Sequence, residues 1–174
     1  LVGHWLQLGA VERVTIEPRG QALGVTYISR DTEDPLYAQA ELSNRLAMML
    51  GGREAELLVK GSVSSGASDD LKRASELAIS MVGSLGFSKT FGLLSVAGVP
   101  KELLGPDIQA AVLSEARAML EKAQAQCEQL LKSRRWQLDA LAQALLQREV
   151  LCGDELMGLL AVGDGPLARV ESLA

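Results

Sequence analysis

The chain has 174 residues, a net charge of −5 and 48% apolar residues, which suffices for one domain with a proper core. Aromatic residues make up only 3%, while leucine, alanine, glutamine and glutamate abound, so helices are favoured over a β-sandwich. Charges of both signs are dispersed without a basic, aromatic-rich patch, which argues against nucleic-acid binding. No apolar run has membrane-spanning length and no signal peptide is visible, so we expect no membrane contact by this segment.

Two short strands are predicted near the start of the chain. Leu1–Leu8 has the pattern of the end of a helix, and Val11–Ile16 is β-branched and alternating. A Pro-Arg-Gly turn separates it from a second predicted strand, Gly24–Ser29. The two strands either pair with each other or lie at a sheet edge. No other segment predicts a strand, so we expect a small sheet.

The remainder of the chain predicts helices, because apolar residues recur at steps of three and four. Gly51-Gly52 is expected to interrupt the first of them, and Gly83–Pro106 to form a long loop. In chain order the predicted helices are Asp34–Leu50, Arg53–Gly61, Asp69–Val82, Asp107–Ser133, Arg134–Arg148 and Asp154–Leu160. We therefore expect a mainly α domain over residues 1–162 that ends in a hairpin of long helices. Residues 163–174 are expected to be a flexible tail.

Several candidate sites have simpler explanations. The segment Gly61–Ser68 has the glycine spacing of a phosphate loop, but Ala67 stands where that motif needs lysine. His4 is the only histidine, and alone it cannot form a histidine-rich zinc site. The cysteines, Cys127 and Cys152, form no CxxC motif, which indicates free thiols in a reducing compartment.

Asp69 and Asp70 are the most informative pair. With Ser68 as the N-cap, two carboxylates in a first helical turn offset the positive end of the helix dipole. Alternatively, one of them turns inward and binds a cation, which requires further ligands from elsewhere. Both interpretations stay open on these residues alone.

Three segments, in order, resemble the peptidase domain of FtsH-type, AAA-linked zinc metalloproteases. They are VTIEPRGQALGVTY, AMMLGGREAELLVKGSVSSGASDDLKRASELAISMV and LDALAQALLQREVLCGDEL. The resemblance is collinear over about Leu1–Leu160 and includes the family's PRG-x-ALG, LGGR-x-AE and TGAS-N-D-L signatures.

The resemblance implies that Asp70 is a zinc ligand. Family members hold zinc with two histidines of an HExxH helix and an aspartate that opens a later helix, while the glutamate of HExxH is the general base. Asp69 departs from the family's usual asparagine and Ser65 from its usual threonine. Leu1-Val2-Gly3 resembles the residues directly after HEAGHA, so His4 is not implied as a ligand. The chain carries one of three expected ligands and no catalytic base, and we expect it to be inactive alone, with an empty zinc site and with Asp70 facing a cleft.

The resemblance also implies partners. Relatives form homohexamers at the cytoplasmic face of the bacterial inner membrane, and an ATPase module that precedes the peptidase domain binds ATP. Unfolded or membrane proteins are the substrates, held as an extended segment beside an edge strand. That strand matches Leu23, Gly24, Val25, Thr26 and Tyr27. The function implied is ATP-dependent zinc proteolysis; a catalytically inactive module for oligomerisation and substrate holding, and a helical scaffold without metal, are the alternatives.

Overall fold

The computed structural model describes residues 1–18, 24–29 and 36–161. The chain divides into two compact units, which are described separately below. One comprises Leu1–Asp34 and Leu130–Ala174, and the other comprises Pro35–Gln129. The prediction of a mainly α fold with a small sheet is confirmed.

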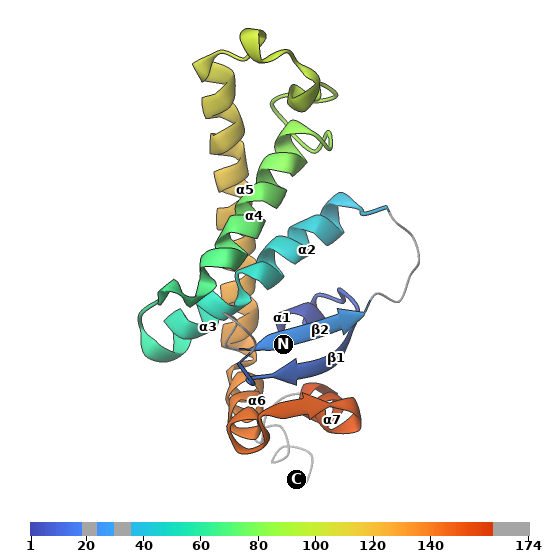
Figure 1. Cartoon of the computed structure of the whole chain (residues 1–174), viewed down its shortest axis with the longest axis vertical. Coiled ribbons are helices and arrows are strands. Elements are labelled where there is room, and N and C mark those ends of the chain that lie inside the picture. The colour runs from blue at the N-terminus through green and yellow to red at the C-terminus, as the bar shows by residue number, and fades with distance from the viewer. Residues whose placement is uncertain (19–23, 30–35, 162–174) are drawn as a thin grey trace, which may run out of the picture. The chain divides into compact units, whose positions relative to one another are not determined.

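The first unit contains an antiparallel sheet with the strand order β2-β1-β3 (Figure 1). Strand β1 is Ala10–Thr15 and β2 is Val25–Ser29, which confirms both predicted strands; of the arrangements left open by the sequence, the two strands pair with each other. The prediction of no further strand is wrong, because β3, Val150–Cys152, pairs with the other side of β1. Three residues are too short to show a period-two pattern, and β3 exists through pairing with β1 rather than through its own pattern.

Three helices accompany this sheet. They are α1 (Val2–Trp5), α6 (Arg135–Arg148) and α7 (Gly153–Ala161). The predicted helices at the end of the chain are therefore confirmed. One apolar core joins strands to helices and consists of Val11, Leu141, Leu151, Leu156 and Leu160.

A buried glutamine ties this unit together. The side chain of Gln137 on α6 is 1% exposed; its Oε1 accepts a hydrogen bond from Trp5 Nε1 (3.0 Å), and its Nε2 donates to the Leu160 carbonyl (2.9 Å). The guanidinium of Arg134 lies over the Trp5 ring, 3.4 Å from its centroid. The Gln137 side chain thus links α6 to α1 and α7. It provides hydrogen-bond partners for the Trp5 indole N–H and the Leu160 carbonyl, which need partners when buried.

The second unit is helical. Its elements are α2 (Gln39–Met49), α3 (Gly51–Lys60), η1 (Ser65–Ala67), α4 (Ser68–Gly83), η2 (Val96–Gly98), η3 (Lys101–Leu103) and α5 (Pro106–Ser133), the last of which continues into the first unit at Leu130. Buried residues recur along α4 at helical spacing: Ala74, Ala78, Met81 and Val82. Among the described residues, no helix is long and apolar enough to cross a membrane.

Three predicted boundaries in this unit are wrong. Helix α2 begins at Gln39 rather than at Asp34-Pro35, which fall outside the described part of the chain; exposed residues precede Leu42, its first buried residue, so no packing supports an earlier start. The helical conformation is interrupted at Leu50 alone, not at the predicted Gly51-Gly52, which are the first two residues of α3. Ser68 is the first residue of α4 and not its cap.

Candidate functional site

The candidate site is the loop between α3 and α4, together with the start of α4. Helix α3 ends at Lys60 and is followed by Gly61, whose φ of 71° is the left-handed conformation that glycine adopts without strain. The loop then leads through the 3₁₀ turn η1 into α4. Asp69 and Asp70 lie in the first turn of α4, as the sequence predicts.

A side chain of α3 holds this loop. Glu56 accepts hydrogen bonds from both the backbone N–H of Ser64 (2.9 Å) and the Ser64 hydroxyl (2.9 Å to Oε1). The same hydroxyl oxygen accepts the N–H of Gly66 (3.2 Å) and so caps η1. Glu56 and Ser64 therefore fix the backbone a few residues before Asp70.

The charge of Glu56 is favoured by these contacts. Hydrogen bonds from the Ser64 backbone and then from its hydroxyl hold the pKa of Glu56 below the ordinary glutamate value. Lys60 Nζ lies 3.6 Å from Glu56 Oε1 and adds to the effect. Glu56 is thus an ionised acceptor at neutral pH.

The Asp70 side chain is exposed on the first turn of α4, as is that of Asp69. The expectation that Asp70 faces a cleft stays a prediction; the exposed carboxylate lies at a helix start whose dipole favours negative charge. This placement is compatible with both interpretations of the acidic pair, because a ligand supplied by another segment would approach an exposed carboxylate.

The zinc site that the resemblance implies does not fit the described residues by themselves. Within 1–18, 24–29 and 36–161, no three histidine, cysteine, aspartate or glutamate side chains are grouped so as to hold a metal ion. His4, on α1, packs edge-on against Trp5. Burial, and then the positive charge of Arg134, lower the pKa of His4, which leaves it neutral at pH 7.

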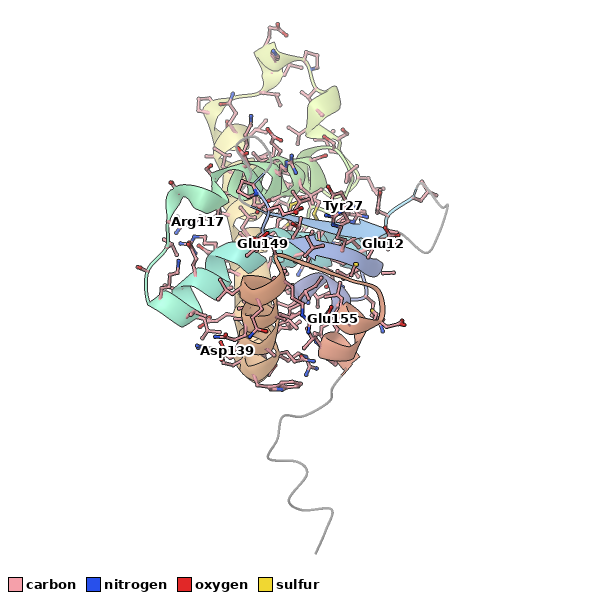
Figure 2. The ribbon with its side chains drawn as sticks, turned by 60° about the horizontal axis from the view of Figure 1, so that its bottom comes forward. Glu12, Tyr27, Arg117, Asp139, Glu149 and Glu155 are labelled. Atoms are coloured by element: carbon pink, nitrogen blue, oxygen red, sulfur yellow. The ribbon has the colours of Figure 1, made fainter. Side chains whose placement is uncertain are left out.

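The candidate substrate strand lies at one edge of the described sheet, since β2 pairs with β1 alone. Tyr27, labelled in Figure 2, and Thr26 are exposed, while Val25 is half-buried. Gly24 approaches β1 so closely that a Cβ there would stand 2.5 Å from the Thr15 carbonyl oxygen. Leu23 is not among the described residues. The strand and Asp70 belong to different compact units.

Two acidic side chains with defined partners were missed by sequence reasoning. Glu54, in α3, is 2% exposed and accepts hydrogen bonds from Arg53 (2.6 Å) and Gln124 (3.1 Å). Glu115, in α5, accepts hydrogen bonds from Ser88 Oγ (2.7 Å) and from the backbone N–H of Lys89 (2.8 Å). No sequence motif marks either glutamate. Gln124 and Ser88 are far from their partners in the sequence, and Arg53 is simply the residue before Glu54.

Glu56, which anchors the loop through Ser64, is the last residue of the LGGR-x-AE motif, but the motif alone does not predict this anchoring role. A glutamate one turn before a helix end, followed by a serine-rich loop, is the signal that identifies such an anchor. Its partner Ser64 lies eight residues further on.

Comparison with known proteins covers nearly all of the described chain. The model of "Peptidase family M41" matches residues 1–159. The chain is 38% identical over 146 residues to an ATP-dependent zinc metalloprotease, FtsH 3, of Sorangium cellulosum, covering 84% of this chain and 24% of that protein. It is 37% identical over 165 residues to FtsH of Thermobaculum terrenum, covering 88% and 26%. The chain thus spans about a quarter of the length of these curated relatives.

Proposed function

Because this chain belongs to peptidase family M41, we propose that it is the proteolytic domain of an ATP-dependent zinc metalloendopeptidase. The family membership confirms the resemblance seen in the sequence. The relatives' names supply zinc and ATP dependence, and their greater length accommodates an ATPase module that these residues do not contain.

Asp70 is the zinc ligand in this proposal, and the other two ligands and the general base come from an HExxH segment outside the 174 residues. The observation that carries the assignment is the hydrogen-bonded path from Glu56 through Ser64 to Gly66, which holds the start of α4 in a defined position. A metal ligand needs such support, because a short carboxylate must meet the ion within a few tenths of an ångström.

Zinc, when bound, supplies an activated water for peptide hydrolysis. The chain's own residues position the zinc ligand and bind the substrate. Glu56 and Ser64 position the Asp70 carboxylate, and β2 binds the unfolded substrate as an added strand through its free edge. Leu23, Gly24, Val25, Thr26 and Tyr27 form this binding segment in the proposal.

The whole protein would act as a homohexamer at the cytoplasmic face of the bacterial inner membrane and would degrade unfolded or membrane proteins. These statements rest on the family resemblance.

A pair of adjacent substitutions in the full-length protein tests the ligand. Asp70→Asn should lower casein cleavage by about a hundredfold or more and reduce bound zinc well below one ion per subunit. Asp69→Asn is the matched control, because it removes the same charge from the same exposed turn and should retain both activity and zinc.

ATP hydrolysis should be unchanged in both variants, and both should keep the circular-dichroism spectrum and melting temperature of the unmodified protein, which excludes misfolding as the cause. Full casein cleavage by the Asp70 variant would refute the assignment. If the unmodified protein binds no zinc and cleaves nothing but still assembles, the domain is the inactive oligomerisation and substrate-holding module instead.

The strand is tested by placing proline at successive positions of β2. Successive N–H groups of a strand point in opposite directions, so Thr26→Pro and Tyr27→Pro each remove one N–H, one directed at β1 and one directed outward. The outward variant should fold normally and raise the KM for an extended peptide about tenfold. If both variants fold and cleave normally, β2 does not hold substrate.

A further inference from the structure

A pocket of about 270 Å³, half open to solvent and hereafter called the cavity, lies in the helical unit, between α2, the segment that follows α4 and the middle of α5. Its apolar lining comes from Phe87, Ala118, Met119 and Ala123. Neither the Asp70 loop nor β2 lines it, so it is separate from the proposed peptidase site.

Hydrogen bonds hold the walls of this cavity in place. Gln126 on α5 donates to Asn44 on α2 (3.0 Å), and Gln39 at the start of α2 donates to the Phe87 carbonyl (3.4 Å). Glu115 on α5 accepts from Ser88 on the segment between α4 and α5 (2.7 Å). All three walls are therefore joined in the protein without a ligand, which reduces the ordering that binding requires.

The charged lining has an excess of positive charge. Lys89 and Lys122 both line the cavity, and neither forms an ion pair with another described residue. Glu115 is the only acidic residue among the described residues of the lining, and its two oxygens already accept the Ser88 hydroxyl and the Lys89 backbone N–H. Two exposed lysines thus contribute to the lining of a largely apolar pocket, whose one carboxylate is already hydrogen-bonded.

We propose that this cavity binds a small apolar carboxylate, with the apolar body among Phe87, Met119 and Ala123 and the carboxylate between Lys89 and Lys122. A cavity of roughly 150 Å³ holds benzene, so 270 Å³ admits a ring with a short chain or a bent chain of about ten carbons. An anion is favoured over a neutral molecule, because only an anion offsets the two lysines.

The test uses decanoate as the probe and the full-length protein, with binding followed by isothermal titration calorimetry. We expect saturable binding with a Kd of about 1 mM or tighter, weakened by added salt. Decanol, which has the same chain without the charge, should bind at least tenfold more weakly. Absence of saturation at about 5 mM decanoate, or equal affinity for decanol, would overturn the proposal.

Two variants locate the site. K89Q/K122Q should weaken decanoate binding at least tenfold, whereas K72Q/K101Q, which removes the same charge from exposed positions outside the cavity, should leave it unchanged. Ala118→Phe fills the cavity from an exposed wall position and should also weaken binding while both lysines remain. Equal loss in both lysine pairs would show a general charge effect and contradict the assigned site, as would full binding by the Phe variant.

Discussion

Glu56 receives both hydrogen-bond donors of Ser64, the backbone N–H and the hydroxyl, across the loop that separates α3 from α4. Because the Ser64 oxygen also caps the turn before α4, the pair connects one helix end to the next helix start. The proposed ligand Asp70 lies at that start, so the geometry of Asp70 depends on a glutamate fourteen positions earlier in the chain.

Glu56→Gln should therefore reduce peptide cleavage by about tenfold through kcat, with KM little changed, because one acceptor oxygen becomes a donor and the loop loses a contact. Steady-state kinetics of the full-length protein measure this. Lys60→Gln is the control: it removes only the exposed ion-pair partner of Glu56, and such pairs contribute little. A KM effect with unchanged kcat would contradict a positioning role.

The acid dependence of stability should involve Glu115. Burial raises the pKa of this carboxyl, but hydrogen bonds from Ser88, Lys89 and Thr90 lower it by a larger amount. The net pKa therefore lies below the ordinary value of 4.5. A lowered folded-state pKa means that the unfolded chain binds the proton more tightly, so the stabilisation is complete above pH 4.5 and is lost as the pH falls below it.

Thermal denaturation between about pH 6 and pH 3 should show a shallower acid limb for Glu115→Gln than for the unmodified chain. Ser88→Ala, which removes one of the donors, should lie between them. The exposed Glu76→Gln should follow the unmodified chain. Parallel curves for all four proteins would show that these hydrogen bonds do not set the acid limb.

The helices could be predicted from the sequence because their evidence is local. In α4 and α5, apolar residues repeat at three and four over many turns, and the same residues are buried in the structure, including Ala74, Ala78, Ala116 and Cys127. Strand β3 has no such signal: three residues carry no period, and only the pairing with β1 makes them a strand.

The site was predictable only in part, for the same reason. The position of Asp70 on a first helical turn follows from local sequence, but its support by Glu56 depends on a loop closing back on the helix before it. Glu54 would be assigned to solvent on its charge, yet it is buried because Gln124 on α5 and its neighbour Arg53 both donate to it. Such long-range partners are not encoded in any spacing.

The buried carboxylate of Glu54 should matter for stability. Glu54→Ala leaves Gln124 and Arg53 without their acceptor and opens a small cavity, so we expect a loss of about 1–3 kcal/mol in the free energy of unfolding. Urea denaturation followed by circular dichroism measures it, with the exposed Glu76→Ala as control. In a double-mutant cycle with Gln124→Ala the two losses should not add; additivity would show that the 3.1 Å contact contributes nothing.

The two thiols should differ sharply in reactivity. Burial, and then the charge of Glu54, raise the pKa of Cys127 to about 12, whereas Cys152 is exposed. Since the thiolate is the reactive form, a thiol reagent at pH 8 should label one cysteine per folded chain within minutes and the second only on unfolding. Cys152→Ser should abolish the fast phase. Fast labelling that persists in this variant would mean that Cys127 is accessible.

The hydrogen bonds of Gln137 should stabilise the sheet-containing unit. Gln137→Leu keeps the size of the side chain but leaves Trp5 Nε1 and the Leu160 carbonyl without their partner. Because each unsatisfied group costs about 1–3 kcal/mol when buried, we expect a total loss of about 2–4 kcal/mol in urea denaturation. Gln143→Leu, the same change at an exposed position of α6, should change the stability by less than about 0.5 kcal/mol. Equal effects in the two variants would mean that the leucine itself, rather than the lost hydrogen bonds, is responsible.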